Sequence, residues 1–305
     1  MDGLRKKNRK ASALLVPLFA LVAFSWMTSS VAQWAPREDP TAPRDADGNV
    51  IMDAPAPRTA SGTPDLSGLW MRTNSGPPPG GRGGGGVSLE PEQAPVPLDP
   101  DAPPIAAFFE AGQNMEDGLP YTPWAKALRD ERAASNARDN PDALCMPMGF
   151  LQFHQQPQPR MIIQTDKMIL IEYEANYGVR HIYLDGRELP PQGEPQPWWY
   201  GYSIGYWDGD ALVVETNNLR GADEDSVADG WLDVNGSPYT REAKITERFR
   251  RPTFGHLQID FTIEDPKAYT RPWTVRVDQR LLPDQELIEF ICNENQQFGR
   301  RIQLN

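Results

Sequence analysis

Apolar and polar side chains alternate with a period of two over most of the chain after residue 160, which is the pattern of strands that bury one face. Turn-forming Gly, Asp, Asn and Pro residues interrupt this alternation at short intervals. Short strands with hardly a helix between them predict a mainly β protein, with an antiparallel sheet closed or nearly closed into a lipocalin-like barrel. The predicted strands are residues 160–165, 167–174, 178–184, 199–207, 211–217, 242–250, 256–264, 273–281 and 286–292.

One helix is predicted to precede these strands. Thr122 suits the N-cap position, Pro123 suits the first helical position, and Asn140-Pro141 ends the helical pattern. The folded domain, a helix followed by a β-barrel, is therefore expected at residues 105–305.

Residues 33–104 are rich in Pro, Gly and Asp. Such a composition buries too little apolar surface to offset chain entropy, so this segment is predicted to be a flexible arm. One stretch within it, PDLSGLWMR at residues 64–72, is expected to dock on the barrel as an edge strand. The rest of the arm, residues 33–57 and 74–104, is expected to add nothing to the core.

The first 32 residues have the composition of a secretory signal peptide. Five cations in residues 1–10 precede an apolar run at residues 13–24, and small residues suit cleavage near Ala32/Gln33. The apolar run is shorter than the roughly 20 residues that span a membrane. We expect a periplasmic or secreted protein with no membrane span after cleavage, an uncleaved anchor being the alternative.

The charge of the chain limits its partners. The formal net charge is −12, and removal of a leader with five cations and one anion brings it to about −16. Such a charge argues against nucleic acid and against anionic membrane surfaces as partners.

Only two cysteines are present, Cys145 and Cys292. In an oxidising compartment an isolated pair is expected to form a disulfide. The alternative, a catalytic thiol, requires a basic partner and partial exposure.

Candidate chemistry rests on acidic residues, because the large catalytic fingerprints are missing and the chain has three histidines. Neither a metal nor another cofactor is expected. Glu247 alternates with apolar side chains, so it should point into the core, where a carboxylate needs a partner. Arg180 and His181, on another strand, are the nearest candidates for that role. Other glutamates on apolar faces of their strands are Glu172, Glu215 and Glu289.

Carboxylates that converge with a histidine or an arginine could act as general acid and base in hydrolysis or elimination. A structural ion-pair network is the alternative, as are glutamates at the rim of the barrel that reach water.

The stretch PQPWWYGYSIGYWDGDALVVETNN, residues 195–218, has two unlike faces when read with a period of two. On one face, two tryptophans flank three of the smallest side chains. Glycine weakens a strand interior, so the space above it must be filled by another part of the chain or by a ligand. This face comprises Trp199, Gly201, Ser203, Gly205 and Trp207, and the other comprises Tyr200, Tyr202, Ile204 and Tyr206.

The tyrosine face is the predicted lining of the barrel. A direct hairpin turn at residues 208–209 places Glu215 on this face, and Glu247 is expected to join it in one interior. The two tryptophans are then expected to pack under the arm or the helix. The predicted ligand-binding residues are Tyr200, Tyr202, Tyr206, Glu172, Arg180 and Glu289, and the candidate catalytic residues are Glu247, Glu215 and His181.

Seven segments between residues 58 and 295 form an ordered set of motifs. They are RTASGTPDLSGLW (58–70), NP…C.P.G (140–149), RHIYLDGR (180–187), WWYGYSIGYWDGDALVVET (198–216), WLDVNG (231–236), ITERFRR (245–251) and EFICNEN (289–295). This set resembles an uncharacterised family of secreted, β-rich bacterial proteins. The resemblance implies a shared fold and export and brings no reaction with it. Many relatives carry a His-Ser pair after the WLD segment, where this chain has Pro238-Tyr239-Thr240, so no role of that histidine transfers here.

Three functions fit these features. The favoured one is an exported β-barrel that binds a small organic or glycan ligand in an aromatic, acid-containing cavity. The second is a cofactor-independent hydrolase or lyase that uses inward-facing carboxylates. The third is an envelope assembly protein whose Pro/Gly-rich arm tethers it to a partner. The sequence does not indicate an oligomeric state.

Overall fold

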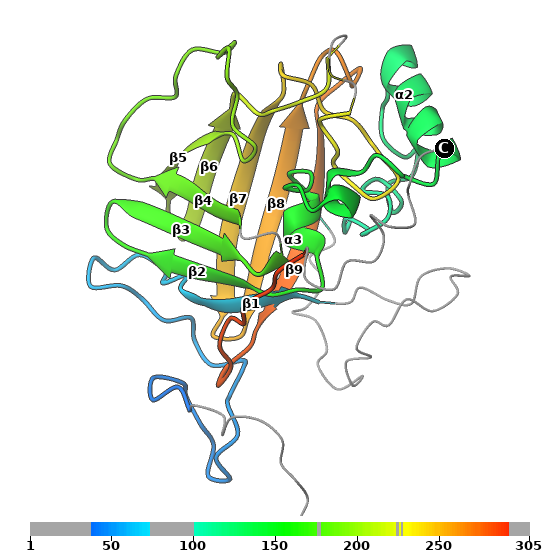
Figure 1. Cartoon of the computed structure of the whole chain (residues 1–305). Helices are drawn as coiled ribbons and strands as arrows, with labels where there is room; N and C mark the ends of the chain where they lie inside the picture. Colours follow the sequence, from blue (N-terminus) through cyan, green and yellow to red (C-terminus); the bar gives the residue numbers. More distant parts are fainter. Residues whose placement is uncertain (1–37, 74–100, 176–177, 224–225, 227, 293–305) are drawn as a thin grey trace, which may run out of the picture. The chain divides into compact units, whose positions relative to one another are not determined.

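The computed structural model describes residues 38–73, 101–175, 178–223, 226 and 228–292 (Figure 1). The predicted signal peptide, its cleavage site and most of the 74–104 segment lie outside these residues. In the described part of the chain, no helix is long and apolar enough to cross a membrane.

The described residues form a mainly β structure built on a closed barrel of nine strands, as the alternation of side chains predicts (Figure 1). The strands are β1 (Gly68–Arg72), β2 (Arg160–Gln164), β3 (Met168–Tyr173), β4 (Gly178–Tyr183), β5 (Tyr202–Asp208), β6 (Ala211–Asn217), β7 (Lys244–Thr253), β8 (His256–Glu264) and β9 (Trp273–Leu281).

Each strand pairs with its neighbours in chain order, and β9 pairs with β1 to close the ring. Strand direction cannot alternate throughout a ring of nine strands, because nine is odd. The exception is the β4–β5 pair, which is parallel and joins Ile182 to Ser203 and Tyr183 to Ile204. A parallel pair needs a long crossover, and residues 184–201 provide it.

The prediction of a strand at residues 286–292 is wrong, because no strand forms there. Its place in the ring is taken by β1, which was expected at an edge but pairs with both β2 and β9. Strand β9 is therefore paired on both sides, by β8 and by β1, so a tenth strand at residues 286–292 could not pair with it. Trp70 on β1 is fully buried, which anchors this closing strand.

The predicted helix is present as α2 (Pro123–Ala134). The Thr122 side chain caps it by accepting a hydrogen bond from the Ala125 amide at 3.3 Å. A 3-10 helix, η1 (Pro141–Leu144), and a single turn, α3 (Gln152–Gln155), follow before β2.

Part of the predicted arm packs on the barrel, which differs from the expectation for residues 33–57. The turn between β7 and β8 leaves two backbone amides free of the strand ladder. Phe254 donates to the Ala54 carbonyl at 2.7 Å and Gly255 donates to the Met52 carbonyl at 2.8 Å. Met52 and Ala54 also pack against the hydrophobic core. The turn therefore supplies partners that the composition of the arm could not reveal.

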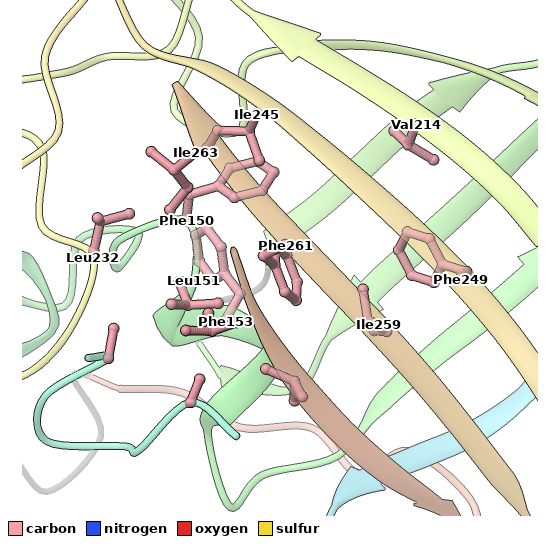
Figure 2. Close-up of a cluster of buried hydrophobic side chains, with 14 of the residues drawn as sticks. Phe150, Leu151, Phe153, Val214, Leu232, Ile245, Phe249, Ile259, Phe261 and Ile263 are labelled. Atoms are coloured by element: carbon pink, nitrogen blue, oxygen red, sulfur yellow. The ribbon is translucent and has the colours of Figure 1, made fainter. Parts of the chain in front are cut away.

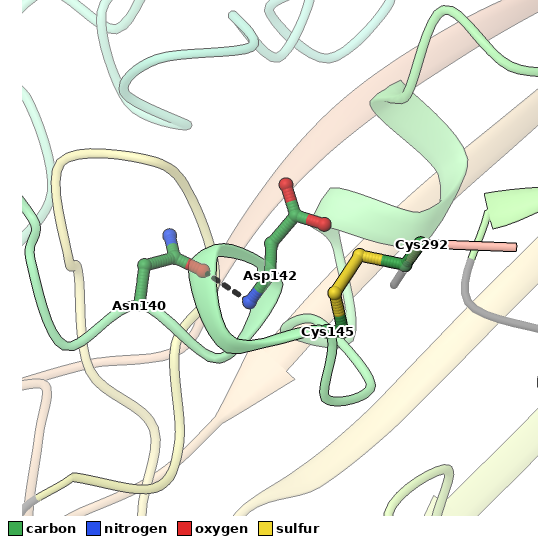
Figure 3. The surroundings of a disulfide bond; sticks show 4 residues. All are labelled: Asn140, Asp142, Cys145 and Cys292. Atoms are coloured by element: carbon green, nitrogen blue, oxygen red, sulfur yellow. Dashed lines mark hydrogen bonds between the residues drawn. A yellow bond between two sulfur atoms is a disulfide. The ribbon is translucent and has the colours of Figure 1, made fainter. Parts of the chain in front are cut away.

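Cys145 and Cys292 form the predicted disulfide, with their Cα atoms 5.6 Å apart (Figure 3). Asn140 caps the adjacent η1 turn, because its side-chain oxygen accepts a hydrogen bond from the Asp142 amide at 3.0 Å. The bond joins the segment before α3 to the segment after β9.

Candidate functional site

The chain closes the barrel near α3 with its own side chains. Phe150, Leu151 and Phe153 are each at most 2 % exposed and belong to the main hydrophobic core. Figure 2 shows Phe150 beside Ile245 of β7 and Ile263 of β8, with Leu151 and Phe153 in the same hydrophobic cluster. A single helical turn has little stability of its own. Burial of these apolar side chains therefore holds α3 in the barrel.

Glu247 of β7 and Arg180 of β4 form an ion pair inside the barrel, where their side chains are 0 % and 1 % exposed. One guanidinium nitrogen donates to Glu247 Oε1 at 3.0 Å, and the other donates to Oε2. A bidentate ion pair of this kind offsets much of the hydration that the two charged groups lose on burial. Burial lowers the pKa of Arg180, but the Glu247 carboxylate outweighs burial and leaves that pKa raised.

Neighbouring side chains occupy the rest of the Arg180 guanidinium. It donates to Thr216 Oγ1 at 3.0 Å and to Ser203 Oγ at 3.1 Å. These two hydroxyls also lie 2.8 Å from each other. The Phe150 ring centroid lies 4.5 Å from the guanidinium carbon. The cation is therefore held by a hydrogen-bonded network from several strands.

His154 of α3 lies beside this pair. Its Nε2 is 3.5 Å from Glu247 Oε1 and 3.4 Å from the Tyr173 hydroxyl oxygen. Burial lowers the pKa of His154 well below its ordinary value, and the cations Arg160 and Arg180 lower it further. The imidazole is therefore neutral at neutral pH.

Three aromatic rings pack next to His154. The centroid of Phe153 lies 5.0 Å from that of Tyr173 and 4.6 Å from that of Tyr200. The rings of Tyr173 and Tyr200 lie 6.0 Å apart and stack. Burial raises the pKa of Tyr173 to about 12 and also raises the pKa of Tyr200. Both hydroxyls therefore remain protonated.

Several polar atoms around His154 are buried without a hydrogen-bond partner in the described structure. We call His154, Gln155, Tyr173, Tyr200 and Gln279 the α3 cluster. Gln279 of β9 belongs to it because its amide donates to the His154 carbonyl at 3.4 Å. Each unsatisfied buried atom costs about 1–3 kcal/mol. The atoms in the cluster are His154 Nδ1, both amide atoms of Gln155, the Tyr200 hydroxyl and Gln279 Oε1.

The structure brings together only part of the predicted site. Glu247, Arg180 and Tyr200 face the interior near α3. The other predicted residues lie outside: Glu289 is exposed beyond β9, and Glu172, His181, Tyr202, Tyr206 and Glu215 lie on the outer face of the barrel.

The prediction that Glu215 and Glu247 share one interior is wrong. The β6–β7 register pairs Val214 with Glu247, so Glu215 points to the opposite face. Glu215 does share a face with Tyr202 and Tyr206, as the hairpin predicts, but this is the outer face.

Tyr200 does not share the outer face with Tyr202 and Tyr206, because it precedes β5. Gly201 separates it from the strand with φ +65°, a left-handed conformation that favours glycine. The change in direction turns Tyr200 toward Phe153, while Tyr202 remains outside.

Protein side chains fill the space above the small residues of β5. A Cβ on Gly205 would lie 2.9 Å from Leu184 and 3.1 Å from Ile182. Trp207 packs against the hydrophobic core and pairs with Leu212 on the inner side of the sheet. Its expected position under the arm or helix is therefore wrong. Trp199 lies under Arg220, whose guanidinium carbon is 4.3 Å from the ring centroid.

The outer face of β4 and β5 carries a row of aromatic rings. The centroid of Tyr202 lies 5.4 Å from those of both Trp198 and Tyr183. His181 continues the row at 6.4 Å from Tyr183. Arg187 covers Tyr183 and donates to the Tyr202 hydroxyl at 3.0 Å. We call these four rings the outer aromatic row.

The sequence reasoning missed His154 as a member of the site. Its segment, FLQFHQQPQPR, combines a histidine with glutamines and aromatic residues between a predicted helix and a predicted strand. Amides in such number beside apolar side chains are a signal of a buried polar site. Among the described residues, no group of three or more His, Cys, Asp or Glu side chains is placed to hold a metal ion.

Neither a family model nor a curated protein nor a solved structure matches this chain. The family resemblance of its motifs therefore stays a prediction.

Proposed function

We propose that this protein is an exported β-barrel that binds a small organic ligand in the α3 cluster. The observation that carries the proposal is the group of buried polar atoms without partners around His154. Native structures pair nearly all such atoms, so the exceptions mark positions that the polar groups of a ligand could complete. Next to them, the rings of Phe153, Tyr173 and Tyr200 offer an apolar wall for a flat ligand.

The leader-like sequence and the disulfide support export, because disulfides persist in oxidising compartments. The buried position of the cluster has a consequence for entry. His154 and Gln155 are each 1 % exposed, so a ligand must displace the α3 turn before it reaches them. Binding is therefore expected to be slow relative to diffusion.

The first experiment measures binding of benzamide to the full chain by ligand-observed NMR and calorimetry. Benzamide is neutral and flat, and its amide both donates and accepts hydrogen bonds, as the unpartnered atoms require. We expect saturable binding at one site. Gln155→Leu should weaken it by at least about tenfold, because the variant removes two of the unpartnered atoms.

Gln164→Leu is the matched control, because the Gln164 amide is fully used. It accepts from the Leu66 amide at 2.9 Å and donates to the Pro64 carbonyl at 3.0 Å. Gln164→Leu should lower stability and leave binding unchanged, whereas Gln155→Leu should leave the stability of the free protein unchanged or raised. If benzamide fails to bind and both variants destabilise equally, the unpartnered atoms are structural and the proposal is wrong.

A glycan is the second candidate ligand, and the outer aromatic row favours it. Exposed aromatic planes can stack on sugar rings, and Trp198 is 42 % exposed. Cellobiose, titrated by the same methods, should then bind the wild-type protein. Its affinity should fall in Trp198→Ala and should not change in Gln155→Leu. The opposite dependence on these two variants would assign the sugar to the α3 cluster instead.

Hydrolysis or elimination is supported less well than binding. Glu215 and His181 lie across the sheet from Glu247, and the Glu247 carboxylate is engaged by Arg180. A carboxylate bound on both oxygens in this way is not free to contact a substrate. Any acid–base chemistry would have to use His154, the group nearest to Glu247 with an unpartnered nitrogen.

A further inference from the structure

Two arginines lie near the α3 cluster without an acidic partner. Arg72 is the last residue of β1 and Arg160 is the first residue of β2. Trp70 pairs with Arg160, so Arg72, two residues further along β1, is a diagonal neighbour of Arg160 on the same face. On its other side Arg72 pairs with Gln279, a member of the cluster.

Arg160 is fully buried and bonded only to backbone carbonyls. One terminal nitrogen donates to His154 at 2.6 Å, and the other donates to Gln156 at 3.1 Å and Gln158 at 3.2 Å. Its Nε has no partner in the described structure. These bonds tie the arginine to the α3 segment while its positive charge stays uncompensated.

Arg72 is half-buried, and it also has an unpartnered Nε atom. Its Nε is buried without a partner among the described residues, and its guanidinium carbon lies 5.1 Å from the Phe108 ring centroid. Burial lowers the pKa of Arg72. Burial also lowers the pKa of Arg160 to about 10, with Tyr173 opposing and Arg72 adding to the effect. Both side chains are therefore charged at neutral pH.

The interior carboxylate of this region does not compensate them, because Glu247 is bound by Arg180. Within the described residues, neither Arg72 nor Arg160 forms an ion pair. A buried charge is costly unless it is paired. The region near α3 thus combines excess positive charge with two unsatisfied Nε donors.

We propose that the ligand of the α3 cluster is a small organic carboxylate and that Arg72 and Arg160 bind its carboxylate group. This inference rests on the proposed function and specifies its ligand. A planar carboxylate presents two oxygens, one for each free Nε donor, and guanidinium groups match this geometry. Its organic part lies against Phe153, Tyr173 and Tyr200, and His154 and Gln279 accept or donate the remaining hydrogen bonds.

The charge of the whole chain acts in the opposite direction at long range. A formal net charge of −12 repels anions from the surface. Such repulsion is screened by salt, whereas contacts in a buried site are screened much less. Association with a carboxylate should therefore become faster as salt rises from low to physiological concentration.

The experiment compares three molecules of nearly equal shape and different charge: benzoate, benzamide and benzamidinium. Each is titrated into the full chain by calorimetry and ligand-observed NMR at neutral pH. We expect benzoate to bind at least about tenfold more tightly than benzamide, and we expect no detectable binding of benzamidinium. Equal affinity for benzoate and benzamide would overturn the carboxylate inference and leave the proposed function standing. If none of the three binds, both proposals are wrong.

Arg72→Met assigns the effect to one side chain. Because Arg72 uses no hydrogen bond that the described fold depends on, the variant should fold, and it should reduce the preference for benzoate over benzamide to about one. Arg248→Met is the matched control, since Arg248 lies on the outer face of β7 and pairs with Asp208 at 2.8 Å in water. Arg72→Lys keeps the positive charge but lacks the planar guanidinium group, so it should give an intermediate preference for benzoate over benzamide. It is also the variant to use if Arg72→Met does not fold. A preference unchanged in these variants would contradict the role of Arg72.

Discussion

The inner and outer faces of β4–β7 differ sharply, although residues adjacent in sequence supply both. Arg180 and His181 are neighbours, as are Glu247 and Arg248, yet one member of each pair is buried and the other faces outward. Inside, the Arg180–Glu247 pair is at most 1 % exposed and tied into hydroxyls of two further strands. Outside, Arg248 pairs with Asp208 at 2.8 Å with both side chains in water.

This difference teaches that burial, and not the type of residue, sets the role of a charge in this protein. Water satisfies an outer charge whether or not it has a partner, so an outer ion pair contributes little. An inner charge has lost its water, so its partners must replace all of it. The unpartnered Nε atom of Arg160 is costly for that reason, because this side chain is fully buried.

The largest expected effect follows from breaking the inner ion pair. Arg180→Met leaves the Glu247 carboxylate buried and unpaired, which should cost about 3–5 kcal/mol of unfolding free energy. Arg248→Met, which breaks the outer pair with Asp208, should cost at most about 1 kcal/mol. Urea unfolding followed by tryptophan fluorescence measures both. Equal losses would show that the two faces do not differ as described, and the double variant Arg180→Met/Glu247→Leu should recover much of the lost stability.

A smaller effect is expected from packing on β5. Gly205→Ala places a Cβ within 2.9–3.3 Å of Leu184, Ile182 and Leu212, and such overpacking should cost about 1–3 kcal/mol. Tyr206→Thr, one residue along on the outer face, should change stability by no more than about 0.5 kcal/mol, because Tyr206 is 51 % exposed. Thermal unfolding of the two variants compares the faces directly. A neutral Gly205→Ala would mean that the inner face of β5 is open and not filled by its neighbours.

The smallest expected effect is the change of stability with pH that the buried His154 causes. The pKa of His154 is lowered in the fold, so below the ordinary value of about 6.5 the unfolded chain takes up a proton that the folded chain refuses. Stability should fall as pH drops below that value, by up to about 1.4 kcal/mol per pH unit.

His154→Gln should remove this part of the slope, as seen in urea titrations between pH 7 and pH 5. Tyr173→Phe is the control: it removes a neighbouring hydroxyl, keeps the imidazole and should keep the slope. An unchanged slope in His154→Gln would show that the imidazole is not held neutral.

The sequence by itself determined the features that depend on near neighbours in the chain. Strands β6, β8 and β9 have the predicted bounds, because a period of two reports one buried face wherever turns interrupt it. The cap of α2 was readable from Thr122-Pro123, and the disulfide followed from an isolated pair of cysteines. The shared face of Glu215 and Tyr202 was also readable, because one hairpin fixes it.

Only the tertiary structure decided which of those faces is inside. A shift of one residue in register inverts every side chain of a strand, and local sequence does not fix the register between β6 and β7. The closing role of β1 and the position of His154 beside Glu247 depend on segments that are far apart in the chain. Contacts of that kind form because the assembled barrel excludes water from one face, and no alternation within a single strand records which face that will be.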